Sequence, residues 1–157
     1  MIWACAYRHR RYILGLIPEY GPGGGEGIEL ETLAGTMVAY EKSLVRAFPE
    51  PGHSERVIYV RDLLTGHIVQ EAPTAEARTP GDVGKGAAIR LVLKRDGSCA
   101  WTVLIERQPT VIQVWVADRL GRRLLASATG IAPRSLKLTG STLKWLEDGK
   151  PTYAILH

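Results

Sequence analysis

Short apolar runs alternate with turn-forming residues along the whole chain of 157 residues. The runs are rich in Val, Ile, Leu, Tyr, Trp and Thr, and Gly, Pro or Asp separates them, which is typical of β-strands joined by tight turns. No long window has the i, i+3, i+4, i+7 apolar spacing of an amphipathic helix. The nearest candidate, residues 39–47, is short and could equally be a strand. The pattern therefore predicts an all-β fold.

The expected strands lie near residues 2–7, 11–16, 28–33, 36–42, 56–61, 67–71, 88–94, 99–106, 110–117, 122–127, 134–138, 141–146 and 151–156. Three segments between them, 18–26, 48–55 and 72–86, gather Gly, Pro and polar residues and are expected to be irregular. A loop as long as 72–86 is more often functional than a tight connector is.

Several predicted hairpins repeat one another. An apolar strand, a Gly turn and a strand bearing an aromatic residue recur in "LETLAGTMVAYE" (30–41), "LVLKRDGSCAWT" (91–102) and "SLKLTGSTLKWLE" (135–147). Gly35, Gly97 and Gly140 mark these turns. A second kind of hairpin follows the first two copies, with turns that run from Asp62 to Gly66 and from Asp118 to Gly121. Asp can accept hydrogen bonds from nearby amides to start such a turn, and Gly adopts the positive φ that ends it.

Together these hairpins define a unit of four antiparallel strands. One unit covers residues 28–71 and a second covers 88–127, while partial units are expected at 1–17 and 134–157. A four-stranded sheet has two faces to bury, and a repeat buries them by stacking each sheet on the next copy. We therefore expect one domain over residues 1–157, built from blade-like sheets as in a β-propeller. A single β-sandwich or barrel of the same strands is the alternative.

The second kind of hairpin carries a resemblance to known propellers. "VIYVRDLLTGHIVQ" (57–70) and "VIQVWVADRLGRRLL" (111–125) resemble the third and fourth strands of WD-like blades, in which an aromatic–Asp pair precedes a turn ending in Gly. In this chain Arg61 and Ala117 precede the Asp. The wider pattern is similar to TolB-like propellers and to propeller-like proteins of actinobacteria. The resemblance implies a bacterial propeller, and the repeats supply about three blades, fewer than a closed ring has. The chain could therefore be a piece of a longer propeller, or two copies joined head to tail as a homodimer could complete a ring.

The charged residues suggest one candidate site. The chain has 20 Lys and Arg residues against 16 Asp and Glu residues, a mild basic bias that is compatible with an anionic partner. Arg8, Arg10 and Arg11 lie in the first hairpin, and Arg119, Arg122 and Arg123 lie at the matching position of a later one. If the units stack, these turns could form an anion-binding patch, although charge on hairpins also keeps sheet edges soluble. Nucleic acid is a less favoured partner, because aromatic residues are not interleaved with the arginines.

No catalytic, metal-binding or cofactor-binding residue is predicted. Two cysteines, Cys5 and Cys99, are too few for a zinc site and are expected to be small buried hydrophobic residues, with a disulfide between them left open. The four histidines do not share metal-ligand spacing, and "TPGDVGKGA" (79–87) lacks the Ser or Thr of a phosphate-binding loop. The expected function is therefore a non-catalytic binding or scaffold module, with the loops 48–55 and 72–86 as contact surfaces.

Two alternatives to this function stay open. One is a hydrolase or lyase that acts on a glycan through a site built across blades, and the other is weak binding of a polyanion through the arginine-rich turns. No apolar run reaches the length of a membrane span, and the first residues lack the order of charged and apolar regions found in a signal peptide. The sequence does not predict a cellular location, and export of the protein with removal of a leader stays open.

Overall fold

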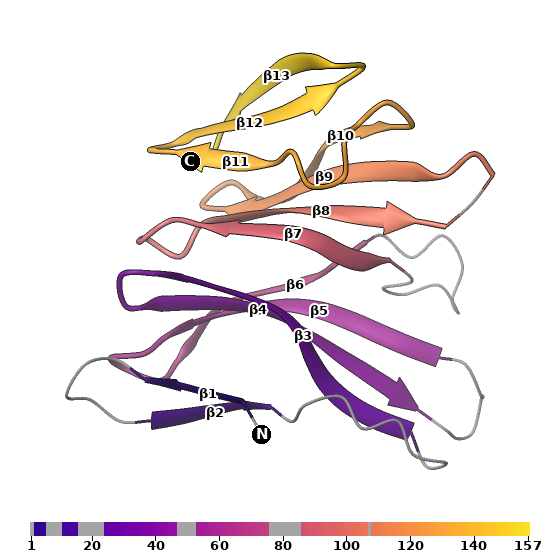
Figure 1. Cartoon of the computed structure of the whole chain (residues 1–157). Coiled ribbons are helices and arrows are strands. Elements are labelled where there is room, and N and C mark those ends of the chain that lie inside the picture. Colours follow the sequence, from indigo (N-terminus) through magenta and orange to yellow (C-terminus); the bar gives the residue numbers. More distant parts are fainter. Residues whose placement is uncertain (1, 6–10, 16–23, 47–52, 76–85, 107) are drawn as a thin grey trace.

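The structure, a computed structural model, describes residues 2–5, 11–15, 24–46, 53–75, 86–106 and 108–157. Within these ranges the chain forms thirteen strands and no helix, which confirms the all-β prediction (Figure 1). The strands are β1 (Ile2–Cys5), β2 (Arg11–Gly15), β3 (Gly24–Ala34), β4 (Met37–Arg46), β5 (His53–Asp62), β6 (Ile68–Pro73), β7 (Ala87–Leu93), β8 (Cys99–Ile105), β9 (Val111–Asp118), β10 (Gly121–Ala128), β11 (Lys137–Thr139), β12 (Thr142–Glu147) and β13 (Lys150–Ile155).

The strands group into four antiparallel sheets, each of which follows the order of the chain. Sheet A consists of β1 and β2, sheet B of β3 to β6, sheet C of β7 to β10 and sheet D of β11 to β13. Sheets B and C contain the strands of the two predicted four-stranded units, and sheets A and D contain those of the two partial units. None of the described sheets closes into a barrel.

Two strands begin inside segments for which the sequence predicts irregular structure. β3 starts at Gly24 and β5 at His53, and both are paired there with the last residues of β4. The sequence "KSLVR" (42–46) continues β4 as a strand, including most of the short candidate helix 39–47. Ladder hydrogen bonds to this extended central strand outweigh the low strand propensity of the glycines in β3.

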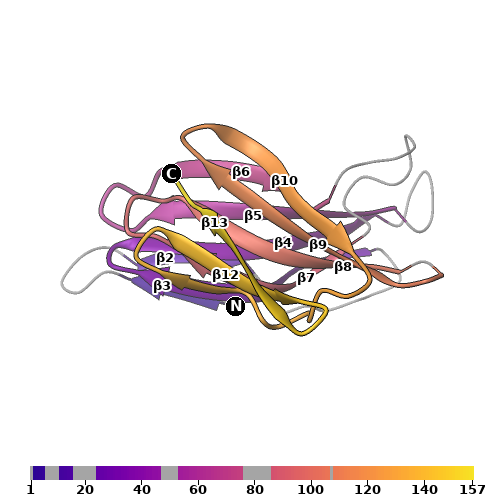
Figure 2. The ribbon, with the colours of Figure 1, turned by 90° about the horizontal axis from the view of Figure 1, so that it is seen from above.

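The four sheets stack face to face in chain order (Figure 1). One apolar core lies between sheets A and B and includes Leu14 and Tyr40. A second core lies between sheets B and C and includes Ile58 and Trp101, and a third lies between sheets C and D. Seen from above, the last strands of sheets B and C, β6 and β10, lie along the same side of the stack (Figure 2). Each internal sheet therefore buries both of its faces against neighbours, as the repeat predicts.

The aromatic residues of the repeated hairpins all face the preceding sheet. Tyr40, Trp101 and Trp145 each belong to the core shared with the sheet before their own. Trp101 follows its turn glycine by one residue fewer than the other two, which alone would place its ring on the opposite face. The β7–β8 connection compensates, because five residues separate the paired Leu93 and Cys99, whereas the other two turns have two residues.

The predicted turn glycines all have positive φ. They are Gly35, Gly66, Gly97, Gly121 and Gly140. Gly66 also makes a close approach, because a Cβ atom there would lie 2.8 Å from Cζ of the Tyr12 ring of sheet A. The turn between β5 and β6 thus packs directly against the first hairpin.

The two cysteines are free, so the disulfide left open by the sequence is not formed. Cys99 is fully buried between sheets B and C, as expected. The expectation for Cys5 is wrong, because its side chain is exposed. Ala4 faces the core between sheets A and B, and the alternation of side chains along β1 turns its neighbour Cys5 to the other face. In the part of the chain that the structure describes, we find no helix with the length and hydropathy required to cross a membrane.

Candidate binding cleft between sheets B and C

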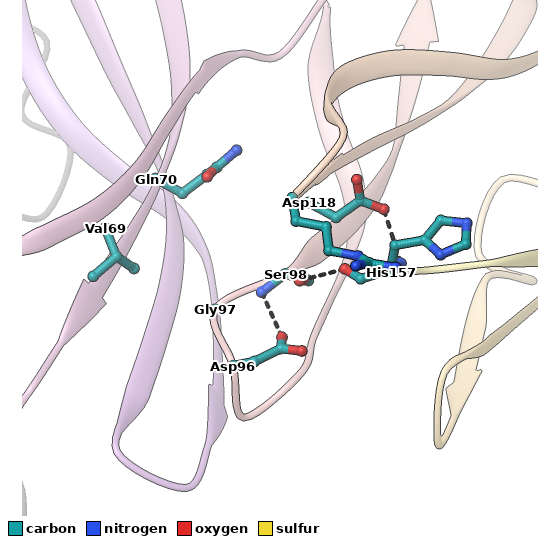
Figure 3. Close-up of a pocket in the computed structure, with 8 residues that line it drawn as sticks. Val69, Gln70, Asp96, Gly97, Ser98, Asp118 and His157 are labelled. Carbon is teal, nitrogen blue, oxygen red and sulfur yellow. Dashed lines mark hydrogen bonds between the residues drawn. The ribbon is translucent and has the colours of Figure 1, made fainter.

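An open cleft with a volume of about 370 Å³ lies between sheets B and C (Figure 3). Because each sheet is an antiparallel meander, the turns β7–β8 and β9–β10 lie at the same end of sheet C, and they form one wall together with the last residue of the chain. The start of β6 forms the other wall. The lining residues are Val69, Gln70, Asp96, Gly97, Ser98, Asp118, Arg119 and His157.

Asp118 is the best connected side chain of the cleft. Arg123 donates two hydrogen bonds to its carboxylate, at 2.6 and 2.9 Å, and the backbone amides of Leu120 and His157 each donate one at 2.9 Å. Burial alone would raise the pKa of the Asp118 carboxyl group, but these hydrogen bonds, led by those from Arg123, lower the pKa to about 2. Asp118 is therefore ionised, and it fixes both its own turn and the end of sheet D.

The β7–β8 turn holds the same segment of sheet D from the other side. The Ser98 hydroxyl donates to the His157 carbonyl oxygen at 2.9 Å, and the Lys94 ammonium donates to that of Leu156 at 3.3 Å. Lys94 also pairs with Asp96 at 2.9 Å, and Asp96 accepts the Ser98 amide. Leu156 itself is fully buried in the core between sheets C and D. Residues from the turns of sheet C and the end of sheet D thus form one hydrogen-bonded wall.

Three residues of the lining have side chains without a partner of their own. Among the residues that the structure describes, the side chains of Gln70, Arg119 and His157 make no hydrogen bond or ion pair. Figure 3 shows the Gln70 amide extending from β6 toward Asp118 on the opposite wall. The cleft therefore combines fixed walls with polar groups that are available to a ligand.

The predicted arginine patch is only partly represented here. Arg8 and Arg10 lie outside the described residues, and Arg11 is described only as part of the β2 backbone. Arg119 lines the cleft, whereas the guanidinium of Arg122 lies 3.9 Å from the centre of the Trp115 ring and Arg123 is paired with Asp118. Of the arginines in the β9–β10 hairpin, Arg119 is thus the one placed to meet a ligand.

The predicted contact loops contribute little to this cleft. Most of the segment 72–86 and residues 48–52 of the segment 48–55 lie outside the described part of the chain. The residues that line the cleft come instead from hairpin turns and from one strand start. Asp96, Ser98 and Gln70 were not singled out by the sequence, because their meeting depends on how sheet B packs on sheet C.

A second polar cluster is buried between sheets B and C, away from the cleft. Glu41 is fully buried, accepts the Ala88 amide at 3.1 Å with one carboxylate oxygen, and lies 3.5 Å from the Arg56 guanidinium. Its other oxygen has no hydrogen-bond partner. Arg56 is also paired with Glu29, which accepts a hydrogen bond from Ser43. Burial raises the pKa of Glu41 to about 7, and the Ala88 amide and Arg56 only partly oppose this shift.

This cluster was also missed by the sequence. Side chains alternate along β4, so Glu41 lies on the same face as Ala39, which is in the core between sheets B and C. A charged residue on a face that is expected to be buried was the signal that could have revealed the cluster. Glu41 does not line the cleft, and we treat it as a structural group with an unusual titration.

A second concave surface runs along the first strands of three sheets. This groove of about 460 Å³ is lined by residues of β3, β7 and β11. Its lining includes Leu91, Val92 and Leu93 of β7 and also the charged residues Glu31, Arg90 and Lys137. Within the described ranges, no group of three or more His, Cys, Asp and Glu residues is arranged to hold a metal ion. We take the cleft between sheets B and C as the candidate binding site, because hydrogen bonds tie the turns of its wall together.

Comparison of the chain with protein-family models, with curated proteins and with solved structures gave no significant match. The class that the fold defines is a stack of antiparallel blade-like sheets, and the function must be argued from the cleft itself.

Proposed function

We propose that the protein is a non-catalytic binding module that holds its ligand in the cleft between sheets B and C. The observation that carries this proposal is the meeting of Gln70 from β6 and Arg119 from the β9–β10 turn at one cleft whose turns are tied together by hydrogen bonds. The side chains of these two lining residues have no partner among the described residues. A prearranged wall reduces the entropy that binding would cost, because the turns do not need to be ordered by the ligand.

The chemistry of the walls supports binding over catalysis. The two carboxylates that line the cleft are both engaged, Asp118 with Arg123 and Asp96 with Lys94. A general acid or base needs a pKa near the working pH, and the pKa of Asp118 is far below neutrality. Neither carboxylate has the properties that hydrolysis or elimination on a glycan would require of a catalytic pair.

A panel of small compounds tests this proposal. Oligosaccharides, nucleotides, dicarboxylates and short peptides are first screened for an increase in the melting temperature of the protein. Those that raise it are then mapped by amide chemical shifts. We expect at least one compound to shift cleft residues such as Gly97 and Ser98, to lose affinity in Gln70→Ala, and to be recovered chemically unchanged by mass spectrometry. Conversion of the compound, or binding that maps to another surface, would overturn the proposal.

A further inference from the structure

We infer that the ligand of this cleft carries an oxyanion group, a carboxylate or a phosphate. This inference rests on the proposed function, because it assigns a ligand chemistry to the same cleft. Its basis is the difference between the lining groups that are already satisfied and those that are not.

The acidic groups of the cleft are satisfied within the protein. Four hydrogen bonds from Arg123, Leu120 and His157 hold the Asp118 carboxylate, and the Asp96 carboxylate pairs with Lys94 and accepts the Ser98 amide. A cationic ligand would have to compete with these bonds for each carboxylate. Among the described lining residues, both carboxylates are therefore already engaged and are less suited to a cationic ligand.

The available groups can all donate hydrogen bonds. The Arg119 guanidinium presents a planar fork of N–H groups that fits a carboxylate or phosphate with two bonds. The Gln70 amide adds N–H donors from the opposite wall. Since Asp96 and Asp118 are paired with Lys94 and Arg123, Arg119 is the charged lining residue that has no partner among the described residues. An acceptor-rich anion is the ligand that these groups fit.

The backbone keeps the two walls close enough to act together. Gly97 has a φ of +91°, and a Cβ atom there would lie only 3.2 Å from Cγ2 of Val69 on the opposite wall. The absence of a side chain at Gly97 thus lets the β7–β8 turn approach β6. A small anion can therefore meet groups from both sheets.

The test is a titration followed by NMR at constant ionic strength. Inorganic phosphate and succinate are the two probes, sodium chloride is the ionic control and glucose is the neutral control. We expect saturable shifts of the Gln70 side-chain amide and of the Gly97 and Ser98 backbone amides with at least one probe. The probe that binds more tightly distinguishes a phosphate ligand from a carboxylate ligand.

Two arginine variants separate a defined site from general attraction of anions. Arg119→Ala is expected to lower the affinity for the probe that binds by about tenfold or more. Arg95→Ala is the matched control, because Arg95 is an exposed arginine of the neighbouring turn that does not line the cleft, and its affinity is expected to stay within about twofold of the parent. Unchanged amide shifts far from the cleft would show that both variants are folded.

Four results would overturn the inference. Equal losses in Arg119→Ala and Arg95→Ala, or shifts that chloride reproduces, would show that the anions respond only to overall charge. A neutral compound that binds in the cleft without dependence on Arg119 would refute the inference of an oxyanion ligand but would leave the proposed binding function supported. Failure of the anions and of every compound in the panel to shift cleft residues would refute both.

Discussion

At the scale of single residues, Glu41 is the group whose environment departs most from what a surface carboxylate experiences. Its pKa is raised from 4.5 to about 7, with burial as the main cause. Between these two pH values the folded protein holds a proton that the unfolded chain has released. The contribution of Glu41 to stability is therefore present in full below about pH 4.5 and is lost as the pH rises through about 7.

We expect Glu41→Gln to remove this pH dependence. An amide resembles the protonated acid, can still accept the Ala88 amide, and leaves Arg56 paired with Glu29. Urea unfolding between pH 5 and pH 8 should show that the parent protein loses up to about 3 kcal/mol more than the variant, since one pKa unit corresponds to about 1.4 kcal/mol. Glu31→Gln, on the exposed side of β3, is the control and should follow the parent. Parallel pH profiles for the parent and Glu41→Gln would contradict the assignment.

The two thiols should differ sharply in reactivity. Cys99 is fully buried, and burial together with the nearby negative charge of Asp118 raises the pKa of its thiol to about 12. Cys5 is exposed. Because the thiolate is the reactive form, a thiol reagent should modify one cysteine per native chain and two in urea, and peptide mapping should place the native label on Cys5. Rapid labelling of Cys99 in the native protein would show that the core between sheets B and C opens readily.

At the scale of elements, the two copies of the repeated Asp…Gly hairpin differ in the groups that their Asp residues bind. Asp62 accepts the Leu64 amide at 2.9 Å and the Thr65 hydroxyl at 3.1 Å, and it also bonds to Thr36 in the neighbouring turn of the same sheet. Asp118 accepts the matching Leu120 amide but also binds Arg123 and the His157 amide. The second copy thus joins two sheets, whereas the bonds of the first stay within sheet B.

We therefore expect Asp118→Asn to destabilise the protein more than Asp62→Asn. Removal of the charge of the buried Asp118 carboxylate, whose partner Arg123 is partly exposed, should cost about 2–4 kcal/mol, as measured by urea unfolding at pH 7. The pKa of Asp118 is lowered to about 2, so its contribution should be retained down to about pH 4 and lost as the pH falls toward 2. Equal losses in the two variants would mean that the bond to sheet D adds nothing.

The packing of sheet A on sheet B can be tested at a single turn. Gly66 and Gly121 both have positive φ, but a Cβ atom would meet Tyr12 at Gly66 and nothing within 4 Å at Gly121. Gly121→Ala should cost about 1–2 kcal/mol from backbone strain alone, and Gly66→Ala about 1–3 kcal/mol more from overpacking. In a Tyr12→Ala background this excess should disappear. If the extra destabilisation of Gly66→Ala persisted in the Tyr12→Ala background, the first hairpin would not pack against this turn.

At the scale of the whole molecule, the sequence predicts the fold much better than the site. The strands and their grouping depend on local signals, namely apolar runs and the Asp and Gly residues of turns, and these are readable one hairpin at a time. The cleft depends on contacts between sheets, such as the bond from the His157 amide to Asp118 across 39 residues. No periodicity within either segment reports that contact, so Gln70 and His157 could not be assigned to one site.

The same scale decides how copies of the chain could assemble. Ala39 and Ala100 precede the aromatic residues of β4 and β8 and are fully buried under the next sheet. Lys144 holds the matching position of β12, is exposed, and lies near the Tyr153 ring. A long charged side chain at this point is typical of a terminal repeat with a polar outer face. A further sheet that packed on sheet D as sheet D packs on sheet C would have to bury or displace the Lys144 ammonium group.

This feature bears on the predicted ring of two copies, which requires sheet D to be covered. We expect light scattering across a concentration series to give a mass close to 17.2 kDa, that of one chain. Tyr153 and Ile155, which are 58% and 50% exposed on sheet D, should then tolerate substitution by Asp without any change in mass. A stable mass of twice this value, reduced to one chain by Tyr153→Asp, would instead support the ring.

The contrast between alanine and lysine at one repeated position also has a consequence for protein engineering. The interfaces inside the stack share one arrangement, in which alanine lies under the next sheet. The outer face of sheet D has lysine at the same position. A duplicated copy of residues 86–130, inserted between the original copy and sheet D, would place an alanine-bearing face against an aromatic-bearing face at both of its contacts. We therefore expect a longer stack to form more readily by internal duplication of a sheet than by addition of a sheet to the lysine-bearing face of sheet D.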